Sequence, residues 1–504
     1  MPPATTAPVV DTSLSPHARL RPLGVDAVRV TDDFWRPRLE RNRTETIRAQ
    51  HAQCVSTGAL QNFRRAAGQT DTDEPFHGMY YSDSDVYKWA EAASWSLAST
   101  ADDELAKTLT DVITLFAAAQ DDDGYLNTYF SVDRVGERWS DLVVRHEMYC
   151  IGHLLQAAVA HARVTGSRDL LDVATRACEH VYERFTPGKV HGTCGHPCLE
   201  MALVELYRTT REKKWLELAI WQLDSRGQGV LNGSEYLLDH APLREQSYVT
   251  GHAVRALYLY AAAVDVVLET GDAELRETVD RLWADLSRHK TAVTGGVGAR
   301  WDGEAFGDPY ELPDRAYNET CAAIAHIFLA WRLLLLTGDG AYRDVVETAL
   351  YNGVLPGLSA SGTEFFYQNP LADAGRHRRQ PWFQCACCPP NIARLLASLP
   401  GYLYTTSEEE SGPGVWVQLY VGNRAEHVLP DGTPLAIDLS TGFPTDGQVE
   451  VTLTPKVPAD FTLYLPVPGW ATDVTVRLGD EIVEPERRDG YLALTRTWRA
   501  GDTV

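Results

Sequence analysis

Three of the nine cysteines in this 504-residue chain lie close together, at Cys385, Cys387 and Cys388, directly before two prolines. The backbone before a proline is held extended or in a turn, so the adjacent Cys387 and Cys388 can direct both sulfurs toward one ion. Glu319 and Cys321, at the start of a long apolar helix, could supply two further ligands. One oxygen and three sulfur ligands suit a four-coordinate zinc ion better than magnesium or calcium.

The spacing of these residues matches no standard zinc finger, so two other interpretations stay open. Free cysteines are often buried, and the cluster could be inert core packing. A redox pair is the third interpretation, although a disulfide between neighbouring cysteines would be strained. The spacing alone therefore leaves a metal site, an inert core or a redox pair.

A glycine-rich loop at 295–312 carries four carboxylates, at Asp302, Glu304, Asp308 and Glu311. A phosphate-binding loop is disfavoured, because no Lys-Ser/Thr pair follows the glycines and the carboxylates would repel the anion. A carboxylate held between glycine and aromatic residues could act as a general acid. A solvated acidic loop is the alternative.

Three histidines, His146, His196 and His252, each lie at or near the start of a predicted helix, after a loop. If these helices form a barrel, the three starts can gather at one mouth and share a polar pocket. Each could equally be a structural histidine. Aromatic residues in the loops 125–130 and 365–370 suit contacts with sugar rings, although core packing explains any single aromatic residue.

Residues from about 34 to 406 predict helices that alternate between a long apolar helix and a charged amphipathic one. Gly or a polar residue ends the first helix of each pair, and Thr, Ser or Asp caps the second. Six such hairpins predict a mainly α fold, a closed (α/α)6 barrel, since their irregular spacing is unlike that of an open solenoid. The helices are expected near 34–57, 84–100, 102–120, 146–165, 168–185, 196–211, 213–225, 249–270, 272–289, 317–337, 340–354 and 390–406.

The pattern changes after about residue 410 to an alternation with a period of two, which predicts an antiparallel β-sandwich. We therefore expect a flexible Pro/Thr/Ser-rich lead at 1–26, a catalytic barrel domain at 27–408 and the sandwich at 409–504. The chain stops at Val504 inside a predicted hairpin, so the sandwich is expected to be incomplete.

The net charge of −23 narrows the set of partners. A chain this acidic gains little from phosphate contacts and is repelled by anionic membranes, so we expect neither nucleic acid nor membrane as a partner. No run of about 18 apolar residues is evident, so no transmembrane helix is expected. The N-terminus lacks the features of a secretory signal and the cysteine count is odd, which favours a reducing cytoplasm. The sequence leaves open whether the chain forms a homodimer.

Several segments between about 27 and 406 are similar to those of one known family. The most specific are the sequences GEAFG at 303–307, ETC at 319–321 and CCPPN at 387–391, with HEMYC at 146–150 and GHAVR at 251–255. On these segments the chain resembles glycoside hydrolase family 127, the β-L-arabinofuranosidases. The resemblance implies an (α/α)6-barrel catalytic domain followed by one or two β-sandwiches.

The resemblance also implies a division of roles among the site residues. A Zn2+ ion would be bound by Glu319, Cys321, Cys387 and Cys388. Cys387 would in addition be the nucleophile, and Glu304 the acid/base. Cys385 would then be a structural residue.

Four further residues would contact the sugar in that family: His146, His196, His252 and, near the nucleophile, Tyr367. One departure from the family pattern stands out. A glutamate is expected two residues after the histidine of the CGH motif, and this chain has Cys198 there. The substitution puts fine substrate contacts in doubt, but not the chemistry.

The activity implied is a retaining, exo-acting hydrolysis that releases terminal L-arabinofuranose from β-L-arabinofuranosides, and the partner is thus a small carbohydrate. The same site acting on another furanoside or on an acidic branched sugar is one alternative. A sugar-binding protein with a structural zinc ion, which would not need Glu304, is another. An epimerase or lyase that uses the histidines as bases is the third.

Overall fold

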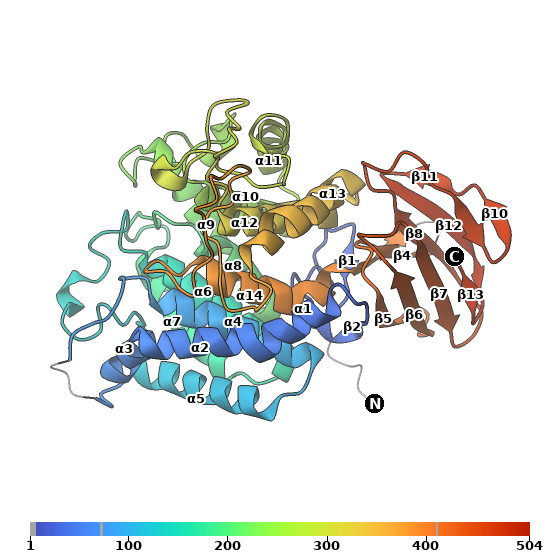
Figure 1. The fold of residues 1–504 in the computed structure, drawn as a ribbon. Helices are drawn as coiled ribbons and strands as arrows, with labels where there is room; N and C mark the ends of the chain where they lie inside the picture. Colours follow the sequence, from blue (N-terminus) through green and yellow to red (C-terminus); the bar gives the residue numbers. More distant parts are fainter. Residues whose placement is uncertain (1–6, 71–73, 410–411) are drawn as a thin grey trace.

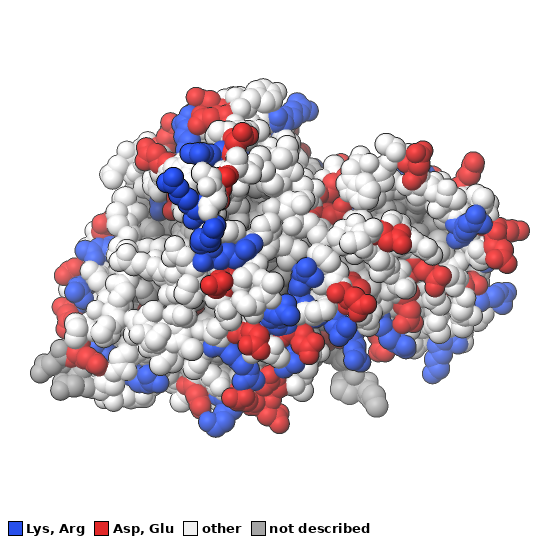
Figure 2. Space-filling model, viewed as in Figure 1, with Lys and Arg blue, Asp and Glu red and all other residues white. Residues whose placement is uncertain are grey.

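The computed structural model describes residues 7–70, 74–409 and 412–504. A helical domain is followed along the chain by a β domain at its side (Figure 1). Lys and Arg side chains are interspersed with Asp and Glu over both domains on the face shown in Figure 2.

Six helices form a closed inner ring in the helical domain. Each packs against the next in chain order, and the last packs against the first, which closes the ring. Two of these helices, α10 and α12, are buried along almost their whole length, as expected for helices with neighbours on every side. The inner helices are α4 (Asp83–Ser99), α6 (Glu147–Thr165), α8 (Leu199–Thr210), α10 (Ala253–Thr270), α12 (Thr320–Thr337) and α14 (Cys388–Ser398).

Six amphipathic helices surround the ring, each packed on an inner helix. Three of them, α5, α11 and α13, start at a capping aspartate: the Asp102 carboxylate accepts a hydrogen bond from the Leu105 amide at 3.1 Å, and Asp272 does the same for Leu275 at 2.9 Å. The outer helices are α2 (Ile47–Ser56), α5 (Asp103–Ala119), α7 (Asp169–Arg184), α9 (Lys213–Ser225), α11 (Ala273–Asp285) and α13 (Gly340–Thr348). The closed (α/α)6 barrel predicted from the sequence is confirmed.

Two local features differ from the predicted helices. The first helix consists of α1 (Arg36–Arg41), a π-helical stretch at Asn42–Thr46 and α2, and the short α3 (Ala59–Ala66) that follows was not predicted. The last helix ends before residue 406, because strand β3 begins at Tyr404.

The described part of the predicted flexible lead, residues 7–26, is packed against the barrel. The amides of Arg19 and Leu20 donate to the Leu335 carbonyl at the end of α12, at 3.0 and 2.9 Å. The amide of His17 donates to Leu268 near the end of α10. Leu20 and Val25 are fully buried. The segment therefore covers the ends of inner helices, which corrects the expectation of flexibility for the residues described.

Among the described residues, α12 is the one helix long and apolar enough to cross a membrane by length and composition. This corrects the expectation that no such stretch exists. However, 89% of the helix window is buried within the structure. Its apolar side chains therefore form the core of the barrel.

The β domain contains two large sheets. Their strand orders are β1-β3-β4-β8-β12-β11 and β13-β7-β6-β5-β2, and β9 and β10 form a separate pair. The strands are β1 (Arg21–Pro22), β2 (Val28–Val30), β3 (Tyr404–Glu409), β4 (Gly412–Val417), β5 (Asn423–Val428), β6 (Pro434–Thr441), β7 (Val449–Pro455), β8 (Ala459–Pro466), β9 (Val476–Leu478), β10 (Glu481–Val483), β11 (Glu486–Arg488), β12 (Tyr491–Trp498) and β13 (Asp502–Thr503).

Two strands of this sandwich come from the N-terminal part of the chain. β1 pairs with β3 and β2 pairs with β5, so each sheet gains one edge strand from residues before the barrel. The pairing of β4 with β8 is parallel, whereas the other pairs described are antiparallel. The prediction of a sandwich made only of residues 409–504 and purely antiparallel is therefore corrected.

Candidate active site

The N-terminal ends of the inner helices meet at one end of the barrel, around a cavity of about 200 Å³. The residue that precedes each of four inner helices lines this cavity: His146 before α6, His252 before α10, Glu319 before α12 and Cys387 before α14. The cavity is also lined by His196, a few residues before α8, and by Lys88, in the second turn of α4. Barrel closure thus brings together residues that are far apart in the sequence.

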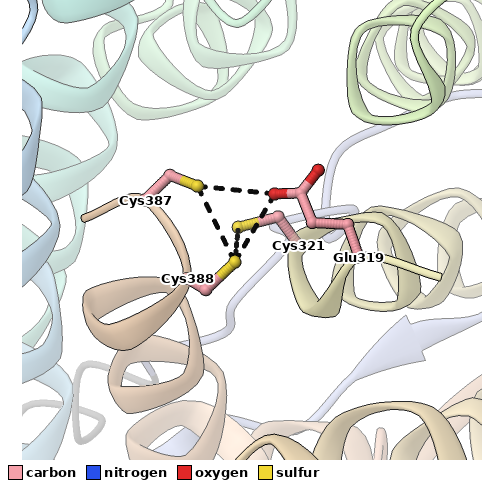
Figure 3. A group of neighbouring side chains, drawn as sticks. All are labelled: Glu319, Cys321, Cys387 and Cys388. Carbon is pink, nitrogen blue, oxygen red and sulfur yellow. Dashed lines mark hydrogen bonds between the residues drawn. The ribbon is translucent and has the colours of Figure 1, made fainter. Parts of the chain in front are cut away.

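The four predicted metal ligands form one compact cluster (Figure 3). The Sγ atoms of Cys321 and Cys388 are 3.4 Å apart, and those of Cys387 and Cys388 are 3.7 Å apart. Glu319 Oε1 lies 3.4 Å from Cys387 Sγ and 3.5 Å from Cys388 Sγ. Tetrahedral ligands on zinc are separated by about 3.5–3.8 Å, given its usual bond lengths. The spacing of these donors therefore fits a zinc-sized ion.

The chemistry of the donors also fits a cation. Glu319 is only 2% exposed, and its Oε2 has no hydrogen-bond partner among the described residues. Burial, and then the neighbouring Cys387 and Glu304, raise the pKa of Glu319 well above its usual range. A buried carboxylate next to thiolates is costly without a compensating positive charge. Among the three interpretations of the thiols, the geometry favours the metal site.

Glu304 lies at the same cavity, presented by a strained turn. Its φ is +53°, and Gly303 before it has a φ of +66°, a region that side-chain-bearing residues rarely adopt. Tyr317 donates a hydrogen bond to Glu304 Oε1 at 3.0 Å, and His252 Nε2 lies 3.1 Å from Oε2. By contrast, Asp308 and Glu311 of the same loop point outward and pair with Arg300. The loop is therefore not simply a solvated acidic segment.

The hydrogen bonds of His252 define which ring nitrogen carries its proton. The amide of Val254 donates to Nδ1 at 3.2 Å, so Nδ1 accepts and Nε2 holds the proton that faces Glu304. Burial raises the pKa of Glu304, but the hydrogen bond and charge of His252, together with hydrogen bonds from Glu319 and Tyr317, lower it below its ordinary value. His252 thus orients this carboxylate.

The other two predicted histidines form a row with His252. The ring centroids of His146 and His196 are 5.7 Å apart, and those of His196 and His252 are 5.8 Å apart. Burial, and then the charge of Arg255, lower the pKa of His146 and of His196 well below the usual value. Both are therefore neutral near pH 7. His146 Nδ1 is buried and has no hydrogen-bond partner among the described residues.

With this geometry in place, two family models match nearly the whole chain. "Beta-L-arabinofuranosidase, GH127 catalytic domain" matches residues 27–401, and "GH127 middle domain" matches residues 414–504. The chain belongs to glycoside hydrolase family 127. It is therefore a glycosidase.

Relatives of known sequence or structure agree with this assignment. A non-reducing end β-L-arabinofuranosidase of Bifidobacterium longum subsp. longum is 36% identical over 492 residues, with 88% of this chain and 73% of that protein covered. The crystal structure of a GH127 β-L-arabinofuranosidase from Geobacillus stearothermophilus T6 is 38% identical with a TM-score of 0.90, covering 94% of this chain and 80% of that one. The GH127 β-arabinofuranosidase BT3674 is 38% identical with a TM-score of 0.91, covering 97% and 80%.

Tyr367, also expected from the GH127 resemblance, lies beside the cluster. The thiol of Cys387 is 3.0 Å from its hydroxyl, and Cys385 Sγ is 3.6 Å from the same oxygen. Cys385 lines the cavity and is half-buried, although it stands outside the group of four ligands. Cys385, which the sequence predicts to be a structural residue, therefore lies at the wall of the cavity.

Cys198, where the GH127 pattern has a glutamate, is buried and lies outside the cavity lining. A Cβ atom added at Gly152 of α6 would lie 2.9 Å from Cys198 Sγ, so the cysteine fills the contact between α6 and α8. Glu200, two residues later, accepts a hydrogen bond from the Cys198 amide at 3.0 Å and faces Arg226 at 3.8 Å. No carboxylate from this segment reaches the cavity.

Sequence reasoning missed several residues of this GH127 site. Tyr317, which holds Glu304, stands two residues before Glu319, and Arg255 follows His252 by three residues on α10. Lys88 of α4 is fully buried, 3.3 Å from Asp85. Tyr317 and Arg255 each lie within three residues of a predicted site residue, whereas Lys88 has no predicted site residue near it in the sequence. None of them stood out without the fold.

Proposed function

We propose that this glycosidase removes single terminal β-L-arabinofuranose units with retention of configuration, with Cys387 as nucleophile and Glu304 as acid/base. One observation supports this most directly. The same small cavity is lined by the half-buried thiol of Cys387 and by the carboxyl group of Glu304. The other two cysteines of the cluster, Cys321 and Cys388, are buried, so Cys387 is the thiol of the cluster with the best access to a substrate.

The size of the cavity supports exo action. Pockets for drug-sized ligands enclose roughly 300–1,000 Å³, whereas this one encloses about 200 Å³. It therefore suits one monosaccharide. A chain of sugars would have to continue outside it, on the side of the leaving group.

Two displacement steps account for retention. In the first, the Cys387 thiolate attacks the anomeric carbon, the glycosidic C–O bond breaks, and Glu304, in the minority of molecules that its lowered pKa leaves protonated, gives its proton to the departing oxygen. In the second, ionised Glu304 takes a proton from water, the water oxygen attacks the anomeric carbon, and the C–S bond breaks to restore the thiolate. Because each step inverts the anomeric centre, the product keeps the starting configuration.

Four residues would hold a zinc ion at this site: Glu319, Cys321, Cys387 and Cys388. A bound Zn2+ would supply the positive charge that keeps thiols in the reactive thiolate form at neutral pH. Tyr367 would direct its hydroxyl to the Cys387 sulfur, and His252 and Tyr317 would hold Glu304. His146 and His196, both neutral, would bind sugar hydroxyls.

A screen of aryl arabinofuranosides of both enantiomers and both anomers, with the metal content of the same sample measured, tests this proposal. We expect turnover of the β-L substrate with about one equivalent of zinc per chain. Preferred turnover of another furanoside would replace the sugar assignment but not the mechanism. Sugar binding without turnover of any glycoside, or epimerase or lyase activity that survives the loss of Cys387, would overturn the proposal.

A further inference from the structure

An exposed tryptophan stands directly beside the proposed acid/base. Trp301 precedes the short helical turn Asp302–Glu304 that carries Glu304, and its side chain is 54% exposed. It does not line the cavity that accommodates the first sugar. A large apolar side chain in this position covers no core, so its packing alone does not explain it.

The Trp301 ring is nevertheless held in place. Its indole Nε1 donates a hydrogen bond to the Arg315 carbonyl at 2.7 Å. Its ring meets that of Tyr317 edge to face, with centroids 5.2 Å apart and planes at 82°. Tyr317 is the residue that donates to Glu304. The indole is therefore fixed relative to the acid/base.

A second aromatic ring borders the same turn. A Cβ atom added at Gly303 would lie 2.9 Å from the ring of Tyr236, so this ring packs directly on the glycine that precedes Glu304. Tyr236 is 40% exposed and lines the cavity, and its ring lies 6.0 Å from that of His252. Trp301 and Tyr236 thus both border the turn that presents Glu304.

Given the proposed function, on which this inference rests, the place of the leaving group follows. Glu304 must reach the glycosidic oxygen, so the group attached to that oxygen lies next to the turn that carries Glu304. Sugar rings present apolar C–H faces that pack on aromatic rings, and their hydroxyls remain free for solvent and polar neighbours. We propose that Trp301, with Tyr236, forms a binding platform for the sugar ring of the leaving group.

The test compares three β-L-arabinofuranosides whose leaving groups are a sugar, a hexyl chain and methanol. In the variant Trp301→Ala, kcat/KM for the disaccharide should fall about fivefold to tenfold, mainly through KM, because a lost aromatic contact is worth about that much. Values for the methyl and hexyl glycosides should change less than twofold. Trp301→Phe should retain most of the activity on the disaccharide, because it keeps an aromatic face.

Trp470 supplies a matched control. It is 63% exposed and belongs to the β domain, where it donates to Glu347. Trp470→Ala should leave the ratio of disaccharide to methyl glycoside activity unchanged. An equal change of that ratio in both variants would overturn the platform.

The remaining outcomes distinguish a failure of this inference from a failure of the proposed function on which it rests. Wild-type protein that cleaves none of the three glycosides overturns the proposed function, and the platform with it. Active wild-type protein with equal losses on all three substrates in Trp301→Ala overturns the platform alone, because Trp301 would then act by holding Glu304. A loss on the hexyl glycoside as large as that on the disaccharide would show a general apolar surface and overturn the assignment of a sugar.

Discussion

The two ends of the barrel both bury charged groups, but they balance those charges differently. At the end where the inner helices finish, Arg208 is fully buried and contacts Glu205, Asp265 and Glu269 at 2.5, 2.7 and 2.6 Å. Arg332 adds a second contact to Asp265 at 2.5 Å. At the end where the inner helices begin, a carboxyl group and three thiols converge.

The difference shows which end of the barrel balances its buried charges without a ligand. We call the end where the inner helices begin the open end, and the end where they finish the closed end. Buried charges are tolerated when each has a partner of opposite sign with good geometry. The arginines at the closed end supply such partners from the protein itself. At the open end, Glu319 keeps an oxygen without a partner among the described residues, and the donors gain most from a bound cation. The open end is therefore built for ligands, and the closed end for holding the helices together.

Backbone strain follows the same division. Several residues other than glycine at or beside the open end have a positive φ, among them His146 at 57°, Glu304 at 53° and Asn318 at 42°. At the closed end, three of the four inner helices that finish in this conformation do so at glycine. Strain that is held by the surrounding structure is common at functional sites.

Replacing the proposed nucleophile should have the largest effect at the open end. In Cys387→Ser we expect the loss of nearly all turnover, because a serine hydroxyl stays protonated near neutral pH and is a far weaker nucleophile than a thiolate. The measurement is kcat/KM on an aryl β-L-arabinofuranoside. The matched control is Cys385→Ser, which changes a thiol beside the same tyrosine and should keep most of the activity. Substantial turnover by Cys387→Ser would disprove the nucleophile assignment.

Replacing the proposed acid/base should have an effect that depends on the leaving group. In Glu304→Gln, kcat/KM on substrates with poor leaving groups should fall by about a hundredfold to ten-thousandfold, the usual contribution of general acid catalysis. An activated aryl glycoside should lose much less, because its leaving group needs no proton. Glu311→Gln, on the same loop but directed outward, is the control. Equal losses on both kinds of substrate would count against the acid role.

A substitution at the closed end should lower the free energy of unfolding rather than the catalytic activity of the folded protein. Arg208→Met leaves three carboxylates without their shared partner, so the free energy of unfolding should fall by about 3–5 kcal/mol. Arg168→Met, which removes an exposed pair with Asp172, should cost less than about 1 kcal/mol. Denaturant unfolding measures both values. If Arg208→Met instead lowered kcat of the folded enzyme with no change in stability, the contrast between the two ends would fail.

Removal of the proposed metal ion should have a smaller effect on stability. Zinc at about 100 times its dissociation constant should stabilise the fold by roughly 3 kcal/mol, and a chelator should remove that gain along with activity. Thermal unfolding together with metal analysis tests this, and zinc should restore both properties better than magnesium or calcium. Equal unfolding temperatures with and without zinc would show that the open end needs no cation.

Local patterns predicted the barrel and the site residues to different degrees. The apolar stripes and helix stops were enough for the twelve helices of the barrel, since helix periodicity and capping are local. The edge strands β1 and β2 are two and three residues long, too short for any period to appear. The Pro, Thr and Ser content of the segment at 7–26 predicts flexibility, whereas its fixed position depends on hydrogen bonds to carbonyls near the ends of α10 and α12 and on the burial of Leu20 and Val25.

By itself, the sequence determined the (α/α)6 barrel, the family through its motifs, and the residue types that could bind zinc or donate a proton. Only the tertiary structure decided that Glu319 and Cys387, 68 residues apart, meet at 3.4 Å, and that Glu304 faces the cavity while Glu311 faces solvent. It also decided the place of Trp301, which no motif singled out. The physical reason is that ring closure of the inner helices sets these distances, and closure depends on packing between elements that are remote in the chain.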